Sequence, residues 1–252
     1  MHQIRLIDMN NTKAVLTGYT KGLGAALARE LLDRGIPVVG LARSISPELA
    51  AGFPDVLTPI EIDLASNHAL ADWLRTDALR AYLDDCSTVL LINNAGTVQP
   101  VGALHQQDPL DVAAAIALNV GAPLILAAAV VALTPGKQCR VLHISSGAGS
   151  SAYPGWSVYC ATKAALDHHA RAVKLDAEEG VRICSLAPGV IDTDMQAQIR
   201  DTPEEFFPMR QRFVDLKRDG SLVSPADCAA RVVKYVLADS FGDKAVDDLR
   251  SV

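Results

Sequence analysis

The chain has few aromatic residues and no excess of positive charge. Aromatic residues make up 5% of its 252 residues, so the stacking surfaces used by proteins that bind single-stranded nucleic acid would be scarce. Lysine and arginine number 23 against 29 aspartates and glutamates, which gives a net charge of −6. A general binder of nucleic acid or of an anionic membrane surface needs a basic face. We therefore expect neither nucleic acid nor a membrane as a partner.

Paired cysteines and long apolar runs are also missing. The five cysteines are scattered without a CxxC pair, so the sequence predicts free thiols and no metal site. The first residues, Met1–Lys13, lack the apolar stretch of a signal peptide. The longest apolar run, roughly Pro123–Leu133, is shorter than the ~20 residues of a membrane helix. These absences lead us to expect a cytoplasmic protein.

Short β-branched apolar runs alternate with segments whose apolar residues recur at helical spacing. The predicted strands are Ala14–Thr17, Val38–Leu41, Val56–Ile62, Val89–Ile92, Val141–Ser145 and Val181–Leu186. The predicted helices are Leu23–Arg34, Ala65–Leu83, Leu110–Leu133 and Val158–Glu178. Near-continuous apolar strands between helices are typical of a parallel sheet buried on both faces. We predict a single doubly wound α/β domain over residues 1–252.

The alternation stops after the sixth run. Residues 190–222 are charged and irregular but carry several large apolar side chains, among them Phe206, Phe207 and Phe213. We interpret this segment as a lid over a substrate, and the alternative is a surface helix pair. Ser224 followed by Pro225 then predicts the start of another helix, with serine as its N-cap.

Glycines follow the first predicted strand. Gly18, Gly22 and Gly24 are spaced GxxxGxG at the start of a helix. Such glycines let backbone N–H groups and a helix N-terminus approach a pyrophosphate. The spacing differs from both the GxGxxG fingerprint and the P-loop. A turn with a purely structural role is the alternative, but the position at the end of the first strand of a doubly wound pattern favours a phosphate cradle.

The second predicted strand ends without a carboxylate. An acidic residue at that point would bind an adenosine ribose and repel a 2′-phosphate, whereas arginine favours the phosphate. The chain has Arg43 there, and Lys21 in the glycine segment adds a second cation. This pattern favours NADP(H) over NAD(H), unless both are ordinary surface cations. Asp63 could bind the adenine amino group or could be the N-cap of the next helix.

Tyr159 and Lys163 are spaced i and i+4 at the start of a predicted helix, thirteen residues after Ser146. This spacing places the phenol and the ammonium on one helix face. A nearby cation lowers the pKa of a phenol and so makes it a better acid–base group at neutral pH. Ser146, at the end of the fifth strand, could donate a hydrogen bond to a substrate oxygen on which charge develops.

Together these motifs resemble the short-chain dehydrogenase/reductase family. The similarity covers Thr17–Gly24, Asn93–Gly96, Asn119, the Ser/Tyr/Lys set and the segment Pro188–Thr193. It implies a Rossmann-type fold with a seven-stranded parallel sheet that binds NAD(P)(H). In that family Tyr159 would be the proton donor, Lys163 would bind the nicotinamide ribose, and Ser146 would hold the carbonyl. Asn119 would anchor a water of the proton relay, and Thr193 would bond the carboxamide.

We expect the cofactor NADP(H) to contact residues from every strand end. These are Gly18, Thr20, Lys21, Gly22, Leu23, Gly24, Arg43, Ser44, Asp63, Leu64, Asn94, Ala95, Gly96, Tyr159, Lys163, Pro188, Gly189, Val190, Ile191 and Thr193.

Further segments are similar to the branch of the family that holds sepiapterin reductases and bacterial benzil reductases. They include Asn94–Val98, Ser145–Gly149, Pro154–Cys160 and Asp192–Gln198. The resemblance implies an NADPH-dependent reductase of diketones or of a pterin side-chain ketone, with diketones somewhat favoured. It also implies a C-terminal aspartate that anchors a pterin, here Asp247 or its neighbour Asp248. The expected substrate-binding residues are Ser146, Trp156, Tyr159, Met195 and Asp247.

Two other functions remain open. The same residues could serve an NADP-dependent dehydrogenase of a secondary alcohol, or the scaffold could be a non-catalytic sensor of the cofactor. A sensor would not need the Ser/Tyr/Lys set that this chain contains. The segments Leu110–Leu133 and Val158–Glu178 are apolar enough to pack on a sheet and on another copy. We therefore expect a homodimer or homotetramer that uses these helices, as the family resemblance implies.

Overall fold

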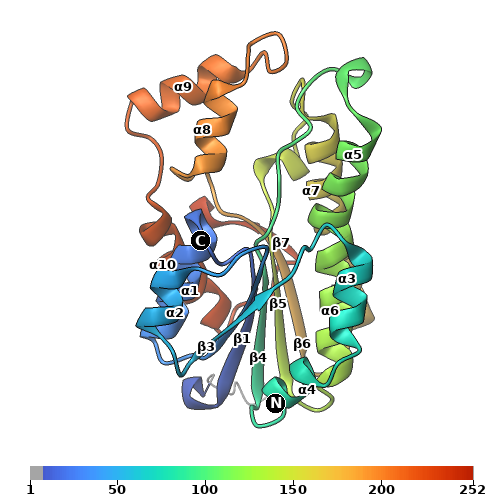
Figure 1. Cartoon of the computed structure of the whole chain (residues 1–252), viewed down its shortest axis with the longest axis vertical. Coiled ribbons are helices and arrows are strands. Elements are labelled where there is room, and N and C mark those ends of the chain that lie inside the picture. The colour runs from blue at the N-terminus through green and yellow to red at the C-terminus, as the bar shows by residue number, and fades with distance from the viewer. Residues whose placement is uncertain (1–7, 252) are drawn as a thin grey trace.

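A seven-stranded, all-parallel sheet forms the centre of the molecule in a computed structural model that describes residues 8–251 (Figure 1). The strand order is β3-β2-β1-β4-β5-β6-β7. The strands are β1 (Thr12–Thr17), β2 (Val38–Ala42), β3 (Leu57–Glu61), β4 (Thr88–Asn93), β5 (Gln138–Ile144), β6 (Val181–Ala187) and β7 (Val246–Asp248). The predicted doubly wound sheet is confirmed. That the whole chain forms one domain stays a prediction, and its residues 1–7 and 252 lie outside the described part.

Helices cover both faces of the sheet, because its central strands are apolar on both sides. All residues of β2 and β4 are buried. In Figure 1, α1, α2 and α10 lie on one side of the sheet, and α3, α4, α6 and α7 lie on the other. The helices are α1 (Gly22–Asp33), α2 (Pro47–Gly52), α3 (Asn67–Leu74), α4 (Ala78–Leu83), α5 (Pro109–Ile116), α6 (Ala122–Leu133), α7 (Ser157–Asp176), α8 (Asp194–Asp201), α9 (Arg210–Arg218) and α10 (Pro225–Leu237).

The single helix predicted over residues 65–83 is two helices, α3 and α4. Between them, the Thr76 hydroxyl donates a hydrogen bond of 2.6 Å to the carbonyl of Trp73. A side-chain hydroxyl that donates a hydrogen bond to a backbone carbonyl in this way competes with helix propagation. The first of these helices is capped by Ser66, whose hydroxyl oxygen accepts a hydrogen bond from the amide of Ala69. Ser66, and not Asp63, is therefore the N-cap.

The apolar run Pro123–Leu133 is part of a longer helix than the run length suggested. A π-helical turn, Ala117–Gly121, joins α5 to α6 without a break. Among residues 8–251, this helix of 25 residues is the one that is long and apolar enough to span a membrane. The run Pro123–Leu133 is by itself shorter than a membrane helix, as the sequence indicated, but the helix that contains it is not. In the structure, α6 packs on β4, β5 and α3.

Candidate active site

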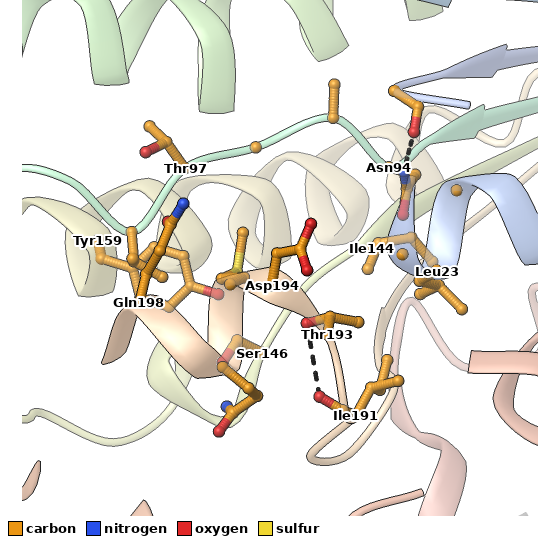
Figure 2. A pocket seen from close by; sticks show the side chains of 18 of the residues that line it. Leu23, Asn94, Thr97, Ile144, Ser146, Tyr159, Ile191, Thr193, Asp194 and Gln198 are labelled. Atoms are coloured by element: carbon orange, nitrogen blue, oxygen red, sulfur yellow. Dashed lines mark hydrogen bonds between the residues drawn. The ribbon is translucent and has the colours of Figure 1, made fainter. Parts of the chain in front are cut away.

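One pocket of about 880 Å³ lies at the carboxyl ends of the parallel strands. Ligands bind at this edge in open α/β sheets. In Figure 2 the pocket extends from Leu23 and Asn94 at one end to Tyr159 and Ser146 at the other. Every residue predicted to contact the cofactor lines it, and so do four of the five predicted substrate-binding residues. The structure thus brings together residues that are far apart in the sequence.

The glycine segment forms a tight cradle between β1 and α1. Gly18 and Gly22 have φ angles of +68° and +54°, which favour glycine. A Cβ at Gly24 would lie 1.9 Å from the carbonyl oxygen of Gly18. The Asn94 amide donates hydrogen bonds to the carbonyls of Thr17 and Gly18, at 3.0 and 3.2 Å, and fixes the cradle to the end of β4. This backbone at a helix N-terminus fits a pyrophosphate.

Two cations line the end of the pocket formed by the glycine cradle and the end of β2. Lys21 and Arg43 both face it, and within residues 8–251 neither forms an ion pair. The end of β2 contributes Ala42, Arg43 and Ser44 to the lining and no carboxylate. Asp63, at the end of β3, is exposed, and its carboxylate accepts a hydrogen bond of 3.0 Å from the amide of Ala65.

The predicted catalytic side chains meet at the other end of the pocket. Tyr159 and Lys163 are one turn apart on α7, and the Lys163 ammonium lies 5.6 Å from the centre of the Tyr159 ring. The ammonium also donates a hydrogen bond of 2.8 Å to the carbonyl of Ile144 at the end of β5. Ser146 begins the short turn after β5 and lies on the same side of the pocket as Tyr159 (Figure 2).

Burial controls the pKa of both ionisable groups. It raises the pKa of Tyr159 to about 12, and the hydrogen bond with Ser146 opposes this rise. It lowers the pKa of Lys163 to about 8, and the negative charge of Asp167 opposes this fall. The sequence predicts that Lys163 lowers the pKa of Tyr159, but in the structure burial raises it. At neutral pH the phenol is protonated and can donate a proton.

Asn119 lies in the π-helical turn and not in the pocket lining. Its amide oxygen accepts a hydrogen bond of 2.9 Å from the amide of Thr97, and its amide nitrogen donates to Thr97 and Thr162 at 2.8 and 3.1 Å. Both polar atoms of the Asn119 side chain are therefore hydrogen-bonded, and these contacts hold the Thr97 segment against α7. The role of Asn119 in anchoring a water stays a prediction.

Asp247 is not brought to the pocket. Its carboxylate accepts hydrogen bonds of 3.2 Å from both the Tyr235 hydroxyl and the Lys244 ammonium. The C-terminal residue that lines the pocket is Arg250, whose guanidinium is held by the neighbouring carboxylate of Asp248. Among residues 8–251, neither Asp247 nor Asp248 lines the pocket, whereas the positively charged Arg250 does.

Aromatic side chains form the wall of the substrate end. Trp156 stacks on Phe207 at a centroid distance of 4.5 Å and meets Tyr159 edge-on at 5.3 Å. Phe207 and Phe213 come from the segment predicted as a lid, which folds into α8, α9 and their connection (Figure 1). Trp156 is both a pocket-lining residue and part of a buried cluster.

The sequence analysis missed several lining residues. Gln198 and Asp194 are one turn apart on α8, so they share a helix face, and both lie at the pocket in Figure 2. The i, i+4 spacing could have identified this pair. Thr97, Arg212 and Arg250 also line the pocket. Their positions depend on how three separate segments fold over the strand ends, and no local pattern marks them.

Comparisons with known proteins agree with this geometry. The family model for short chain dehydrogenases matches residues 12–204. A benzil reductase that forms (S)-benzoin, from Bacillus cereus, is 35% identical over 88% of this chain and 92% of its own length. Sepiapterin reductase from Meriones unguiculatus is 34% identical, over 90% of this chain and 92% of its own.

A solved structure is also similar. A short-chain dehydrogenase/reductase from Burkholderia vietnamiensis is 47% identical, with a TM-score of 0.71 over 97% of this chain and 99% of that one. The match to the family model and the two reductases, together with the pocket that unites the glycine cradle with Ser146 and Tyr159, leads to one conclusion. The chain belongs to the short-chain dehydrogenase family and is an oxidoreductase that acts on carbonyl or alcohol groups.

Proposed function

We propose that the protein is an NADPH-dependent carbonyl reductase that reduces a ketone or a diketone of the benzil type. The observation that carries this proposal is one pocket that joins Lys21 and Arg43, two cations without an ion-pair partner in residues 8–251, to Ser146 and Tyr159 beside an aromatic wall. One end suits a phosphorylated dinucleotide and the other an aryl carbonyl compound.

The choice of NADPH rests on charge. An adenosine 2′-phosphate placed between the end of β2 and the glycine cradle would meet the guanidinium of Arg43 and the ammonium of Lys21. Charge-assisted hydrogen bonds of this kind contribute about 1.5–3 kcal/mol each. NADH has no such phosphate and therefore lacks these contacts. The pocket therefore favours NADPH over NADH.

The residues of the catalytic end suit a reduction. When bound, NADPH supplies a hydride to the carbonyl carbon of the substrate. The Ser146 hydroxyl donates a hydrogen bond to the carbonyl oxygen, where negative charge develops. Tyr159, protonated at neutral pH, gives its phenolic proton to that oxygen and completes the alcohol. Lys163, held by the carbonyl of Ile144, would bind the nicotinamide ribose.

The substrate end favours an aryl ketone over a pterin. Trp156 and Phe213 line the pocket with aromatic side chains, which suits a phenyl ring. A pterin carries hydrogen-bond donors that a carboxylate would recognise. The expected carboxylate, Asp247, bonds to Tyr235 and Lys244 instead, and Asp194 is a carboxylate that does line the pocket. Reduction of a pterin side-chain ketone is the second candidate, because sepiapterin reductases are among the relatives.

The two remaining alternatives have less support. Oxidation of a secondary alcohol would use the same side chains, but NADP(H) in the cytosol is kept reduced, so the cations at Lys21 and Arg43 favour reduction. A non-catalytic sensor of the cofactor would not need Ser146, Tyr159 and Lys163 around one end of a pocket. The cytoplasm is the proposed location, because all five cysteines are free thiols, as expected in a reducing compartment.

We also propose that the protein is a homodimer or homotetramer. The helices α5 and α7 carry exposed apolar side chains, with Leu110, Ile116 and Leu175 exposed by 81%, 48% and 85%. Association through these helices would cover apolar surface that faces water in a single chain. Sedimentation at micromolar concentration should give at least twice the mass of one chain. A monomer would contradict this proposal.

A cofactor and substrate screen tests the proposed function. Oxidation of NADPH is followed by absorbance with benzil, 1-phenyl-1,2-propanedione or sepiapterin, and each reaction is repeated with NADH. We expect turnover with NADPH, with the diketones preferred to sepiapterin. If all three carbonyl compounds leave NADPH unoxidised, or if NADH serves equally well, the proposal is wrong.

A further inference from the structure

A buried carboxylate lies behind the catalytic side chains. Asp167 is one turn beyond Lys163 on α7, and only 3% of its surface is exposed. Its Oδ1 atom accepts two hydrogen bonds of 2.7 Å, from the hydroxyls of Ser145 on one side and Ser185 on the other. Burying a carboxylate costs free energy unless hydrogen bonds and a nearby positive charge compensate for lost water. The two serines supply the hydrogen bonds.

The positive charge that Asp167 influences is the Lys163 ammonium. Lys163 is itself 5% exposed, and burial favours its neutral form. The negative charge of Asp167 acts in the opposite direction and favours the ammonium. The two residues occupy i and i+4 on one helix face, which brings the charge of Asp167 near that of Lys163, although no direct ion pair joins them among residues 8–251. A neutral lysine would lose the charge with which it binds a cofactor ribose.

The other titratable groups around Lys163 do not supply a negative charge. Tyr159 on α7 is held protonated by burial. His143 on β5 is fully buried, with its ring nitrogens 3.1 Å from Asn93 and His169, and burial keeps it neutral. The turn that contains Asn119 packs on α7 through neutral side chains. Among residues 8–251, Asp167 is therefore the carboxylate that offsets the charge of Lys163.

Asp167 also supports the segment that carries Ser146. Ser145, which donates a hydrogen bond to Asp167, directly precedes Ser146 in the chain. After Ser146 the chain turns back over the carboxylate so closely that a Cβ at Gly149 would lie 2.5 Å from Asp167 Oδ2. The carboxylate thus contacts the chain on both sides of the catalytic serine.

We propose that Asp167 is a positioning residue for the reduction, whose charge keeps Lys163 protonated and whose hydrogen bonds fix the segment that carries Ser146. This inference rests on the proposed function, because it assigns Asp167 a role in that reaction. It predicts two separable effects, one on the titration of Lys163 and one on the geometry of Ser146.

The test is Asp167→Asn, which removes the charge and leaves an oxygen that can accept both serine hydroxyls. Lysine side-chain NMR of the protein without cofactor follows the titration of Lys163, whose resonance is identified by its absence in Lys163→Met. We expect Asp167→Asn to lower the titration midpoint of Lys163 by about 1 to 2 pH units. The basic limb of the kcat/KM profile for NADPH-dependent reduction should move to lower pH by a similar amount.

Ser185→Ala is the matched control, because it removes one hydrogen bond to Asp167 but keeps the charge. Its Lys163 midpoint should stay at the wild-type position. The proposal is overturned if Asp167→Asn leaves the Lys163 midpoint unchanged, or if Ser185→Ala moves it equally. Should Asp167→Asn not fold, Asp167→Ser takes its place with the same expectations. A wild-type protein that reduces no carbonyl compound would refute the proposed function, whereas the NMR result separately decides the charge role of Asp167.

Discussion

Gly24→Ala is a direct test of the phosphate cradle. The new Cβ would lie 1.9 Å from the Gly18 carbonyl oxygen and 2.6 Å from the Asn94 amide nitrogen, so the backbone has to move by roughly 1 Å. Overpacking of this kind costs about 1–3 kcal/mol, and here one of the two opposed atoms is backbone. Alanine is more favourable than glycine in a helix by up to about 1 kcal/mol, which offsets part of this cost. We expect a net loss of about 2 kcal/mol in the free energy of unfolding, or about 4–8 °C in Tm.

The movement should also weaken cofactor binding. Displaced N–H donors lose a charge-assisted hydrogen bond to the pyrophosphate, so the Kd for NADPH should rise about tenfold. Thermal unfolding and fluorescence titration with NADPH measure the two effects. Gly52→Ala, at the end of α2, is the control, because its Cβ meets nothing within 4 Å; it should not lower the Tm and should keep the wild-type Kd. The reasoning fails if Gly24→Ala has the Tm and the NADPH Kd of the wild-type protein.

Two further predictions concern charge. Arg43→Ala should raise the Kd for NADPH by about 10- to 100-fold and leave that for NADH unchanged, and an equal effect on both cofactors would show that Arg43 does not contact the 2′-phosphate. Burial lowers the pKa of His143 from 6.5 to about 3. In the unfolded chain this imidazole therefore binds a proton at a higher pH than in the folded protein, and the free energy of unfolding decreases as the pH falls below 6.5. Denaturant titrations should show that the wild type loses about 2 kcal/mol more than His143→Gln between pH 7 and pH 5; equal losses in both proteins would contradict this.

Local patterns in the sequence were sufficient for the parts of the site that depend on backbone geometry. Gly18, Gly22 and Gly24 follow a buried strand and open a helix, and a phosphate cradle needs little more than that. Tyr159 and Lys163 share a helix face because of their spacing alone. For these residues a correct strand and helix assignment already determines the arrangement.

Features that depend on contacts between distant segments could not be predicted in the same way. Asp247 was expected to face the substrate, but the Tyr235 hydroxyl from α10 and the Lys244 ammonium bind its carboxylate, and Arg250 faces the pocket instead. The raised pKa of Tyr159 follows from burial by surrounding elements, which spacing along one helix does not reveal. The hydrogen bonds of the Asp167 carboxylate likewise form only because β5 and β6 bring Ser145 and Ser185 to it.

The central claim is that Tyr159 donates the proton in an NADPH-dependent carbonyl reduction. Single-turnover oxidation of bound NADPH by benzil, compared between the wild type and Tyr159→Phe, tests it most directly. Loss of the phenolic proton should slow the reaction by a factor of about 10²–10⁴, while the Kd for NADPH stays close to the wild-type value. A Tyr159→Phe protein that oxidises NADPH at the wild-type rate would contradict the claim.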